Sequence, residues 1–331
     1  MAPLGEGFVS ETGAAAVDGV PQRVHSHAAA LAGSEKELFA EAAMFVQAGL
    51  ERDDLVVVAG SPAFQQTLAE EFGGADEVEF DDGVRLNARR APDALGRCLQ
   101  LSARAAARGS GRLRVLAQVD YGPDPRAVRE LACFESAANL APFVAPTDVL
   151  CVYDTSRLSS ELVRSAPCTH TSIVRDGIAR PSASYVDPRD FVRSLPIPAE
   201  PLQQSPPRIA VDDAPALAGL RHTLGAELVR TVTDRDQRED LHLAISEMAA
   251  NAFRHGGRPI SARLWASADR LVCTIADGGR GVDPLYGYWP AHGQDLGRGG
   301  MGLWLARKLC DHVDLSSDDD GTMVRLATAL R

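Results

Sequence analysis

Apolar residues in the first 190 positions recur in two different periods, which predicts alternating helices and strands. A capping box at Ser34–Glu37 opens a stretch in which apolar residues keep helical spacing as far as Leu50. The following run Leu55–Ala59, LVVVA, is apolar throughout, as is typical of a strand covered on both faces. The later elements expected here are helices over 91–108 and 125–140 and strands over Leu113–Val119 and Val149–Tyr153. This alternation indicates an α/β domain whose parallel sheet has helices on both sides.

The last 120 or so residues carry a different pattern, with longer helices and fewer strands. Two long helical patterns precede two strands, and a glycine-rich stretch over 277–299 leads into one more helix and one more strand. The expected elements are helices near 213–231, 235–255 and 301–313 and strands at Ile260–Ala266, Leu271–Ala276 and Thr322–Ala327. Long helices segregated against a few antiparallel strands predict an α+β two-layer sandwich.

A proline-rich stretch separates these two patterns. Ser194–Pro207, SLPIPAEPLQQSPP, has five prolines in fourteen residues, which disfavours a helix or a central strand. Residues 1–22 are rich in Gly and Ala without periodicity and are expected to form a flexible tail. The predicted organisation is a tail (1–22), a first domain (23–193), a linker (194–207) and a second domain (208–331).

Charge argues against nucleic acid or membrane as the partner. The 331 residues include 34 Lys and Arg against 45 Asp and Glu, so the formal net charge is −11. An acidic chain lacks the broad cationic surface that non-specific nucleic-acid or anionic-membrane binding requires. No run approaches the roughly 20 apolar residues of a membrane-spanning helix, and Met1–Val20 has acidic residues where a signal peptide would be apolar.

The cysteines favour a reducing compartment, so the chain is expected to be cytoplasmic. Six cysteines are scattered without a C-x-x-C pair, as is typical of buried thiols. Cys168 and His170 lie two positions apart, but two ligands do not make a zinc site. The first domain also contains no G-x-x-x-x-G-K-[ST] sequence, so no phosphate-binding loop is visible in it.

Candidate chemistry is concentrated in the second domain, first in the helical segment Leu241–His255. Glu247, Asn251 and His255 recur every four residues beside the apolar stripe and share one face of the helix. An amide oxygen suits Mg²⁺, and a carboxylate one turn away can take a proton from a hydroxyl. The alternative is an ordinary amphipathic helix with a solvated polar edge.

Two glycine-rich segments follow. Asp277–Gly281, DGGRG, comes directly after a strand and allows close approach of the backbone to a ligand, although such turns are common. Gly297–Leu303, GRGGMGL, opens a helix, whose unpaired amides and dipole favour an anion such as phosphate. A purely structural role is the alternative for each segment, and the order and spacing of all three segments are more specific than any one of them.

Together these segments resemble the Bergerat-type ATPase fold shared by gyrase, Hsp90, histidine kinases and MutL, and within it the anti-sigma factor serine/threonine kinases. The resemblance covers about 120 residues and rests on SEMAANAFRHG (246–256), DGGRG (277–281), GGMGLWLARKLCD (299–311) and GTMV (321–324). One departure is Ala250, where the family commonly has Thr before the metal-binding Asn. The resemblance implies ATP and Mg²⁺ as cofactors.

The resemblance also implies roles for individual residues. Glu247 would act as general base, Asn251 would hold Mg²⁺, Asp277 would bind the adenine amine, and 282–298 would form a mobile lid containing Tyr286, Tyr288 and Trp289. The full ATP-binding set implied is Asn251, Asp277, Gly279, Gly281, Arg298, Gly300, Met301, Gly302, Leu303 and Thr322.

The first domain resembles the MEDS sensory domain over roughly 22–190. The matching segments are ESAANLAPFVAPTDVLCVYDTSRL (135–158) and THTSIVRDGIARPSASYVDP (169–188). The resemblance implies a RecA-like parallel α/β fold without Walker motifs and leaves the ligand undefined. His25, His27, Tyr153 and Asp154 are candidate pocket residues, with a structural role as the favoured alternative for each.

The combined hypothesis is an ATP-dependent anti-sigma regulatory factor with protein serine/threonine kinase activity. By resemblance it would phosphorylate a STAS-type anti-sigma factor antagonist and sequester a sigma factor, in response to a signal read by the first domain. The alternative is an ATP-binding switch that holds a partner without transferring phosphate. Kinases of this type are often homodimers, and the oligomeric state stays open.

Overall fold

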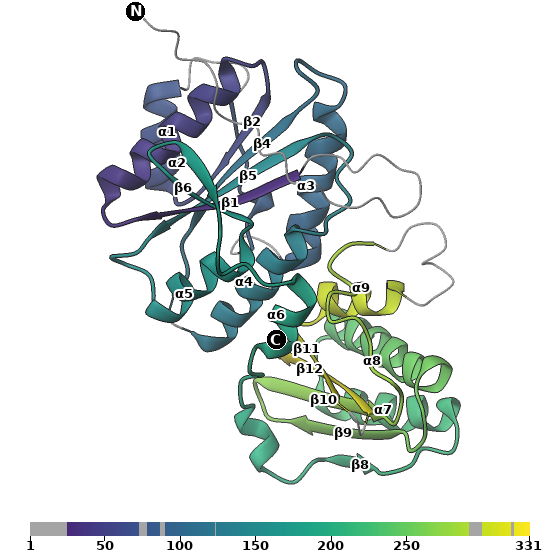
Figure 1. The fold of residues 1–331 in the computed structure, drawn as a ribbon. Helices are drawn as coiled ribbons and strands as arrows, with labels where there is room; N and C mark the ends of the chain where they lie inside the picture. Colours follow the sequence, from purple (N-terminus) through teal and green to yellow (C-terminus); the bar gives the residue numbers. More distant parts are fainter. Residues whose placement is uncertain (1–24, 73–77, 87–89, 123, 291–299, 319–320) are drawn as a thin grey trace, which may run out of the picture. The chain divides into compact units, whose positions relative to one another are not determined.

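A computed structural model describes residues 25–72, 78–86, 90–122, 124–290, 300–318 and 321–331 (Figure 1). The chain divides into two compact units, each with its own sheet. The N-terminal unit comprises Met1–Arg89 and Asp93–Phe191, and the C-terminal unit comprises Arg90–Pro92 and Val192–Arg331. Among the described residues, no helix is long and apolar enough to cross a membrane.

The N-terminal unit is built on a seven-stranded sheet with strand order β3-β2-β4-β5-β1-β6-β7. Its strands are β1 (His25–Ala32), β2 (Leu55–Ala59), β3 (Val78–Phe80), β4 (Leu113–Val119), β5 (Thr147–Asp154), β6 (Ser172–Arg175) and β7 (Ile178–Pro181). Its helices are α1 (Glu35–Leu50), α2 (Pro62–Phe72), the 3₁₀ turn η1 (Asp82–Val84), α3 (Ala91–Ala105), α4 (Pro125–Ala138), α5 (Ser160–Thr169) and α6 (Pro188–Ser194). The first two residues of α3 and the last three of α6 are assigned to the C-terminal unit. All strand pairs are parallel except β6 with β7, so the expected parallel sheet is in fact mixed and mostly parallel.

Helices pack on both faces of this sheet, as the alternation predicts. α1 and α2 bury Leu38, Val46 and Phe64 against one face, and α3 buries Leu101 against the other. The Ser34 hydroxyl accepts a hydrogen bond from the Glu37 amide at 3.3 Å, which confirms the predicted helix start.

The central strand β1 is absent from the sequence-based prediction. Its sequence, HSHAAALA, has no Val, Ile, Thr, Phe, Tyr or Trp, the residues typical of strands, and its position depends on parallel pairing with β5 and β6. Successive β1 side chains point to opposite faces, so Ala28 and Ala30 join the core under α1 while His27 points to the other face.

The C-terminal unit has a five-stranded antiparallel sheet with strand order β11-β12-β10-β9-β8. Its strands are β8 (Ile209–Val211), β9 (Ser261–Ala266), β10 (Arg270–Asp277), β11 (His312–Asp318) and β12 (Gly321–Ala329). Its helices are the 3₁₀ turn η2 (Pro201–Gln204), α7 (Leu217–Thr231), α8 (Arg235–His255) and α9 (Gly300–Leu309). α7, α8 and α9 bury their apolar residues in one core with the sheet, which is the predicted α+β layering.

One predicted helix is too long. The pattern over 301–313 places Val313 in a helix, but α9 ends at Leu309 and Val313 lies in β11. Val313 and Leu315 alternate with polar residues and pair with β12, so tertiary strand pairing overrides the helical spacing. β8 and β11 are both edge strands that the sequence pattern misses.

The proline-rich stretch over 194–207 packs against the sheet face opposite the helices. Leu202 packs on Trp265, and the Trp265 indole N–H donates to the carbonyl of Ser205 at 2.9 Å. Glu200 is buried and forms a bidentate ion pair with Arg270 at 2.8 and 3.1 Å. This stretch is therefore a fixed part of the C-terminal unit rather than a free spacer.

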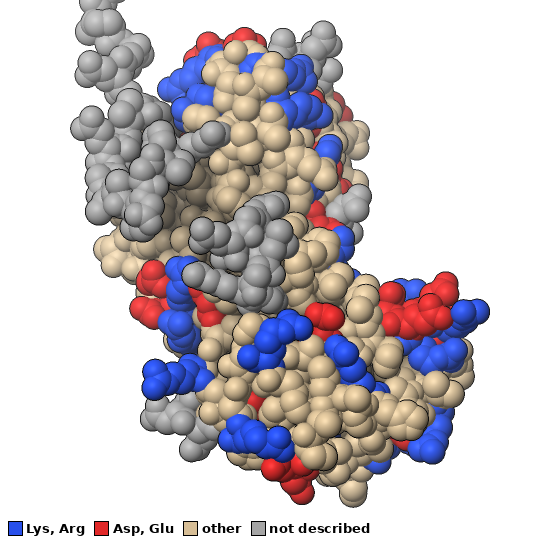
Figure 2. All heavy atoms as spheres, turned by 90° about the vertical axis from the view of Figure 1, so that its right-hand side faces the viewer, with Lys and Arg blue, Asp and Glu red and all other residues tan. Residues whose placement is uncertain are grey.

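Charges on the described surface are mixed. On the face drawn in Figure 2, groups of Lys and Arg are interspersed with groups of Asp and Glu and separated by uncharged atoms. Within the described part of this face, neither sign forms a continuous field.

Candidate functional site

Helix α8 carries the first group of candidate residues. Asp234 caps its start by accepting from the Gln237 amide at 2.7 Å, and the helix ends at His255 before Gly256. The predicted apolar stripe is buried in the core: Leu241, Ala244, Ile245, Met248 and Ala252. Because this stripe fixes the rotation of the helix, Glu247 and Asn251 point to one side of it and His255 lies exposed at its end.

Glu247 and Asn251 face the start of α9. A Cβ atom placed on Gly302 would lie 3.0 Å from Asn251 Nδ2 and 3.3 Å from Glu247 Oε2. These contacts are tighter than ordinary van der Waals packing, so glycine lets the α9 backbone approach both side chains. The close approach places the first turn of α9, where N–H groups have no partner within the helix, beside a carboxylate and an amide.

Asn251 has an unused acceptor at this place. Its Oδ1 atom is buried and forms no hydrogen bond within the described chain. Buried polar atoms are almost always paired, so an unpaired amide oxygen suggests a missing partner. An oxygen donor of this type suits Mg²⁺, and the site therefore fits the ion that the sequence implies.

Asp277 ends β10 within a set of glycines. Its Oδ1 accepts from the Gly279 amide at 2.8 Å and lies 3.4 Å from the Gly257 nitrogen. The Gly278 amide donates to the Gly257 carbonyl at 2.8 Å, which joins this turn to the end of α8. A Cβ on Gly279 would lie 2.7 Å from the Asp277 carboxylate, so the turn has no room for a side chain there. The glycines hold the carboxylate against the backbone.

Thr322 lies directly across the sheet from Asp277, because the two residues are register partners in the β10–β12 pair. The Thr322 hydroxyl lies 3.4 Å from the Ser317 hydroxyl. Gly281 has φ +83°, a conformation that favours glycine, and a Cβ there would lie 3.0 Å from Ser317. Asp277, Gly279, Gly281 and Thr322 thus lie at one end of the strand pair.

The residues predicted to bind phosphate, at the start of α9, differ in how they are packed. Gly300 begins α9, Gly302 is buried against α8, and Leu303 is 5 % exposed within the hydrophobic core. Only the backbone of Leu303 is therefore able to contribute to a site, because its side chain packs into the interior. Arg298 lies outside the described residues.

The expected mobile lid is firmly packed in its described part, 282–290. Tyr288 is 1 % exposed, and the Arg307 guanidinium lies 4.1 Å from the centre of its ring. Arg307 also donates to the carbonyls of Pro284 and Tyr286, which ties this segment to α9. Tyr288 is thus part of the core in this structure, whereas Tyr286 is 41 % exposed, and the mobility expected of 282–298 stays a prediction. Residues 291–299 lie outside the described part.

In the N-terminal unit the four candidate pocket residues separate into two kinds. The His25 ring nitrogens contact the carbonyls of Thr147 and Ala138, both at 3.1 Å, and burial lowers its pKa to about 4. Asp154 accepts from the amide and hydroxyl of Ser156, and Tyr153 is buried in the interior. These contacts account for His25 and Asp154 as structural residues.

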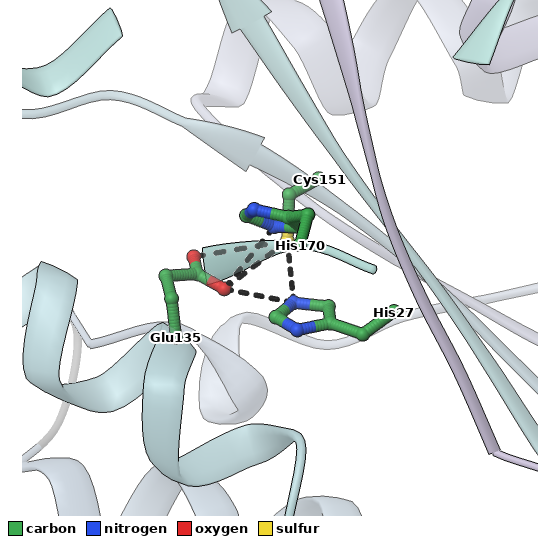
Figure 3. A group of neighbouring side chains, drawn as sticks. All are labelled: His27, Glu135, Cys151 and His170. Carbon is green, nitrogen blue, oxygen red and sulfur yellow. Dashed lines mark hydrogen bonds and ion pairs between the residues drawn. The ribbon is translucent and has the colours of Figure 1, made fainter. Parts of the chain in front are cut away.

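His27, in contrast, lies in a buried group of side chains with metal-ligand chemistry. Its companions are Glu135, Cys151 and His170 (Figure 3). Sequence reasoning singles out His27 and His170 separately but misses the group, because its members come from four separate elements. Cys168 is not among them, since its thiol donates to the Arg164 carbonyl.

Comparison with known proteins supports the division into two domains of different type. Residues 210–328 match the family described as histidine kinase-like ATPase domain. Residues 26–171 match the family described as MEDS, the methanogen/methylotroph, DcmR sensory domain. An ATPase domain of this type implies ATP binding by the C-terminal unit.

Related curated proteins share only the C-terminal part of the chain. Serine-protein kinase RsbW of Bacillus velezensis is 34% identical over 116 residues, which is 31% of this chain and 72% of the relative. The protein of the same name from Bacillus subtilis is 33% identical over 116 residues, with the same coverage, and that of Bacillus pumilus is 30% identical over 118 residues. The chain belongs to the family of histidine kinase-like ATPase proteins that includes serine-protein kinase RsbW, and it carries a MEDS sensory domain ahead of the ATPase domain.

Proposed function

We propose that the C-terminal unit binds Mg-ATP and phosphorylates a serine or threonine of a partner protein. The observation that carries the proposal is the packing of Gly302 against Glu247 and Asn251, with Asn251 Oδ1 buried and unpaired. This arrangement brings a carboxylate, a metal-ligating amide and a helix start together. Phosphoryl transfer needs chiefly positioning and charge neutralisation, and these groups supply both.

Each residue has a definite task in this proposal. Asn251 would hold Mg²⁺ through Oδ1, and the bound ion would neutralise charge on the phosphates. The amides at the start of α9 would donate to the phosphate oxygens. Glu247 would accept the hydroxyl proton of the substrate as the new P–O bond forms and ADP departs.

The adenine base of ATP would be bound at the end of the β10–β12 strand pair. Asp277 would accept a hydrogen bond from the adenine amine through a carboxylate oxygen while keeping its bond to the Gly279 amide. Thr322 would support the ring through its hydroxyl, and Gly281 would leave room for it. The described geometry supports this set; Arg298, outside it, remains a proposed phosphate ligand by resemblance.

We further propose, from the relation to serine-protein kinase RsbW, that the partners are a STAS-type anti-sigma factor antagonist and a sigma factor. The antagonist would be the phosphoryl acceptor, and the sigma factor would be held while the antagonist is phosphorylated. The N-terminal unit, a RecA-like domain in this proposal, would control the choice by favouring one of two states with different partner affinity.

Nucleotide binding is tested by calorimetry of the full chain with Mg-ATP. Asn251→Ala is expected to weaken binding at least tenfold, about 1.4 kcal/mol, because the metal loses a ligand. His255→Ala, an exposed change one turn further along α8, is the matched control and should bind like the parent. Equal affinity of the Asn251→Ala variant and the parent would refute the assignment of the site.

Transfer is tested separately with labelled ATP and a candidate antagonist protein. Glu247→Gln should slow transfer roughly 10²- to 10⁴-fold, the usual contribution of a general base, and leave Mg-ATP binding within a few-fold of the parent. Glu239→Gln, the same change at an exposed position of α8, should retain full transfer. A parent protein that binds ATP and its partner but transfers nothing would instead support the switch without kinase activity.

A further inference from the structure

Four buried side chains of the N-terminal unit converge at the face of the sheet opposite α1. His27 comes from β1, Cys151 from the neighbouring strand β5, Glu135 from α4, and His170 from the residue directly after α5. Exposure is 1 % for His27, 4 % for Glu135, 3 % for Cys151 and 0 % for His170. Figure 3 shows the Glu135 carboxylate projecting from its helix toward the other three side chains.

The polar atoms of this cluster lie at the separations found around a single ion. One donor atom from each residue lies within 4.8 Å of all the others. His27 Nε2 lies 2.9 Å from Glu135 Oε2 and 3.6 Å from Cys151 Sγ. His170 Nε2 lies 3.5 Å from the same Glu135 oxygen, and Cys151 Sγ lies 3.6 Å from it. Two imidazoles, a thiol and a carboxylate therefore face one point.

The outer nitrogen of each histidine is already engaged, so both Nε2 atoms are directed inward. His170 Nδ1 lies 2.8 Å from the Ala166 carbonyl, an acceptor that assigns the proton to Nδ1. His27 Nδ1 lies 3.3 Å from Asn139 Oδ1. The Asn139 amide is held in this orientation because its Nδ2 donates to the Glu135 and Thr169 carbonyls at 2.9 and 2.8 Å. Outer hydrogen bonds of this kind orient histidines that ligate metals.

One inward nitrogen is left without a hydrogen bond. His170 Nε2 is buried and makes none in the described chain, although it lies 3.5 Å from Glu135 Oε2. The thiol contacts of Cys151 are also long, 3.6 to 3.7 Å. Because buried polar atoms are normally paired, the arrangement lacks a central partner that would satisfy all four groups at once.

The cluster also borders an apolar cavity of about 50 Å³. His27, Glu135 and Cys151 contribute to its wall, and the other lining side chains are mostly apolar, such as Leu95, Val115 and Phe134. A space of this size holds a water or a small molecule. One side of the cluster is thus open to an additional ligand from the cavity.

We propose that the N-terminal unit binds one divalent transition-metal ion of the zinc class through His27, Glu135, Cys151 and His170. The donor set explains the class: two imidazoles and a thiolate with one carboxylate suit Zn²⁺ and its neighbours, whereas Mg²⁺ and Ca²⁺ prefer oxygen donors alone. The thiol proton leaves when the metal–sulfur bond forms. The cavity offers the ion a further position for an exchangeable ligand.

The probe for the test is Co²⁺, added to tag-free full-length protein after treatment with a chelator. One equivalent should produce the near-ultraviolet charge-transfer absorption of a cobalt–thiolate bond, and Zn²⁺ should abolish it by displacement. Cys151→Ser should lose this absorption. Cys98→Ser, a change at another buried thiol that lines the same cavity, should keep it.

Asn139→Ala provides a second measurement that does not depend on losing a ligand. It leaves all four donors in place but frees the His27 ring, and it should weaken Co²⁺ affinity by 10- to 100-fold, as outer-sphere changes typically do. Circular dichroism checks that each variant is folded. The proposal is overturned if the folded parent shows no cobalt–thiolate absorption, if Cys151→Ser retains it, or if Cys98→Ser loses it; the four side chains would then be only a buried ionic network.

Discussion

The two candidate sites of this protein are built on opposite principles. The C-terminal site is formed by short local motifs, in which Gly279 and Gly302 leave room where side chains would intrude. The N-terminal cluster is formed by side chains alone, buried and directed at each other from four elements. Short motifs can be recognised from their spacing in the sequence, whereas a site made of side chains from distant segments is visible only once the chain has folded.

The largest expected effect is the loss of stability of the N-terminal unit when a buried ion pair is broken. Asp54 and Arg114 form an ion pair at 2.7 Å with side chains 0 % and 1 % exposed. Asp54→Asn leaves the buried guanidinium with only the more distant Asp148 carboxylate, 3.9 Å away, as a counter-charge, so the free energy of unfolding of this unit should fall by up to about 3–5 kcal/mol. The measurement is chemical denaturation followed by circular dichroism.

The control for this change is the same substitution at a surface pair. Asp212→Asn removes an exposed partner of Arg263, and surface pairs contribute about 0–1 kcal/mol. All three tryptophans belong to the C-terminal unit, so the fluorescence transition should stay in place in Asp54→Asn. An unfolding curve of Asp54→Asn that matches the Asp212→Asn curve would contradict the expectation.

The next effect concerns the backbone of the C-terminal unit. Gly287 has φ +87°, and a Cβ there would lie 2.6 Å from the Leu303 carbonyl carbon. Gly287→Ala should therefore destabilise this unit by about 1–3 kcal/mol, seen as a shift of the tryptophan fluorescence transition. Gly219→Ala, in α7 with open space around it, should be neutral or slightly stabilising. An unshifted transition in Gly287→Ala would show that the segment relaxes away from α9.

A smaller effect is expected at the glycine between the two helices of the proposed nucleotide site. The added methyl group in Gly302→Ala would press on Asn251 and Glu247 and displace them by a few tenths of an ångström. Mg-ATP affinity should fall roughly tenfold in calorimetry, about 1.4 kcal/mol, while the fold persists. An unchanged Mg-ATP affinity would remove the main support for a nucleotide site between α8 and the start of α9.

The smallest expected effect is on cysteine alkylation, which tests whether reagents from solvent reach the N-terminal cluster. Cys168 is half-buried, whereas the other five cysteines are buried, and burial raises the pKa of Cys98, Cys273 and Cys310 to about 12. Alkylation of the native protein at mildly alkaline pH should therefore label Cys168 alone, as read by peptide mass spectrometry. Labelling of Cys151 at the rate of Cys168 would show that reagents reach the cluster through the cavity.

Much of the fold was predictable where local pattern and tertiary context agree. α8 has the predicted limits, and LVVVA is a fully buried strand, because continuous apolar runs and helical stripes remain favourable in the folded unit. The short strands β3, β6, β7 and β8 were not predicted, since three or four residues carry too little periodicity. The predicted boundary between α9 and β11 was wrong because strand pairing with β12 outweighs the helical spacing of the apolar residues.

The sequence by itself determined that this protein has two domains of different class. It also contained the glycine, Asp and Asn motifs of the segment that matches the ATPase family. Those motifs are local because backbone amides and a helix start act within a few residues of each other. Only the tertiary structure brought His27, Glu135, Cys151 and His170 together and packed 194–207 on its sheet. The physical reason is that parallel pairing of β1 with β5 joins residues more than 120 positions apart, a contact that no local pattern encodes.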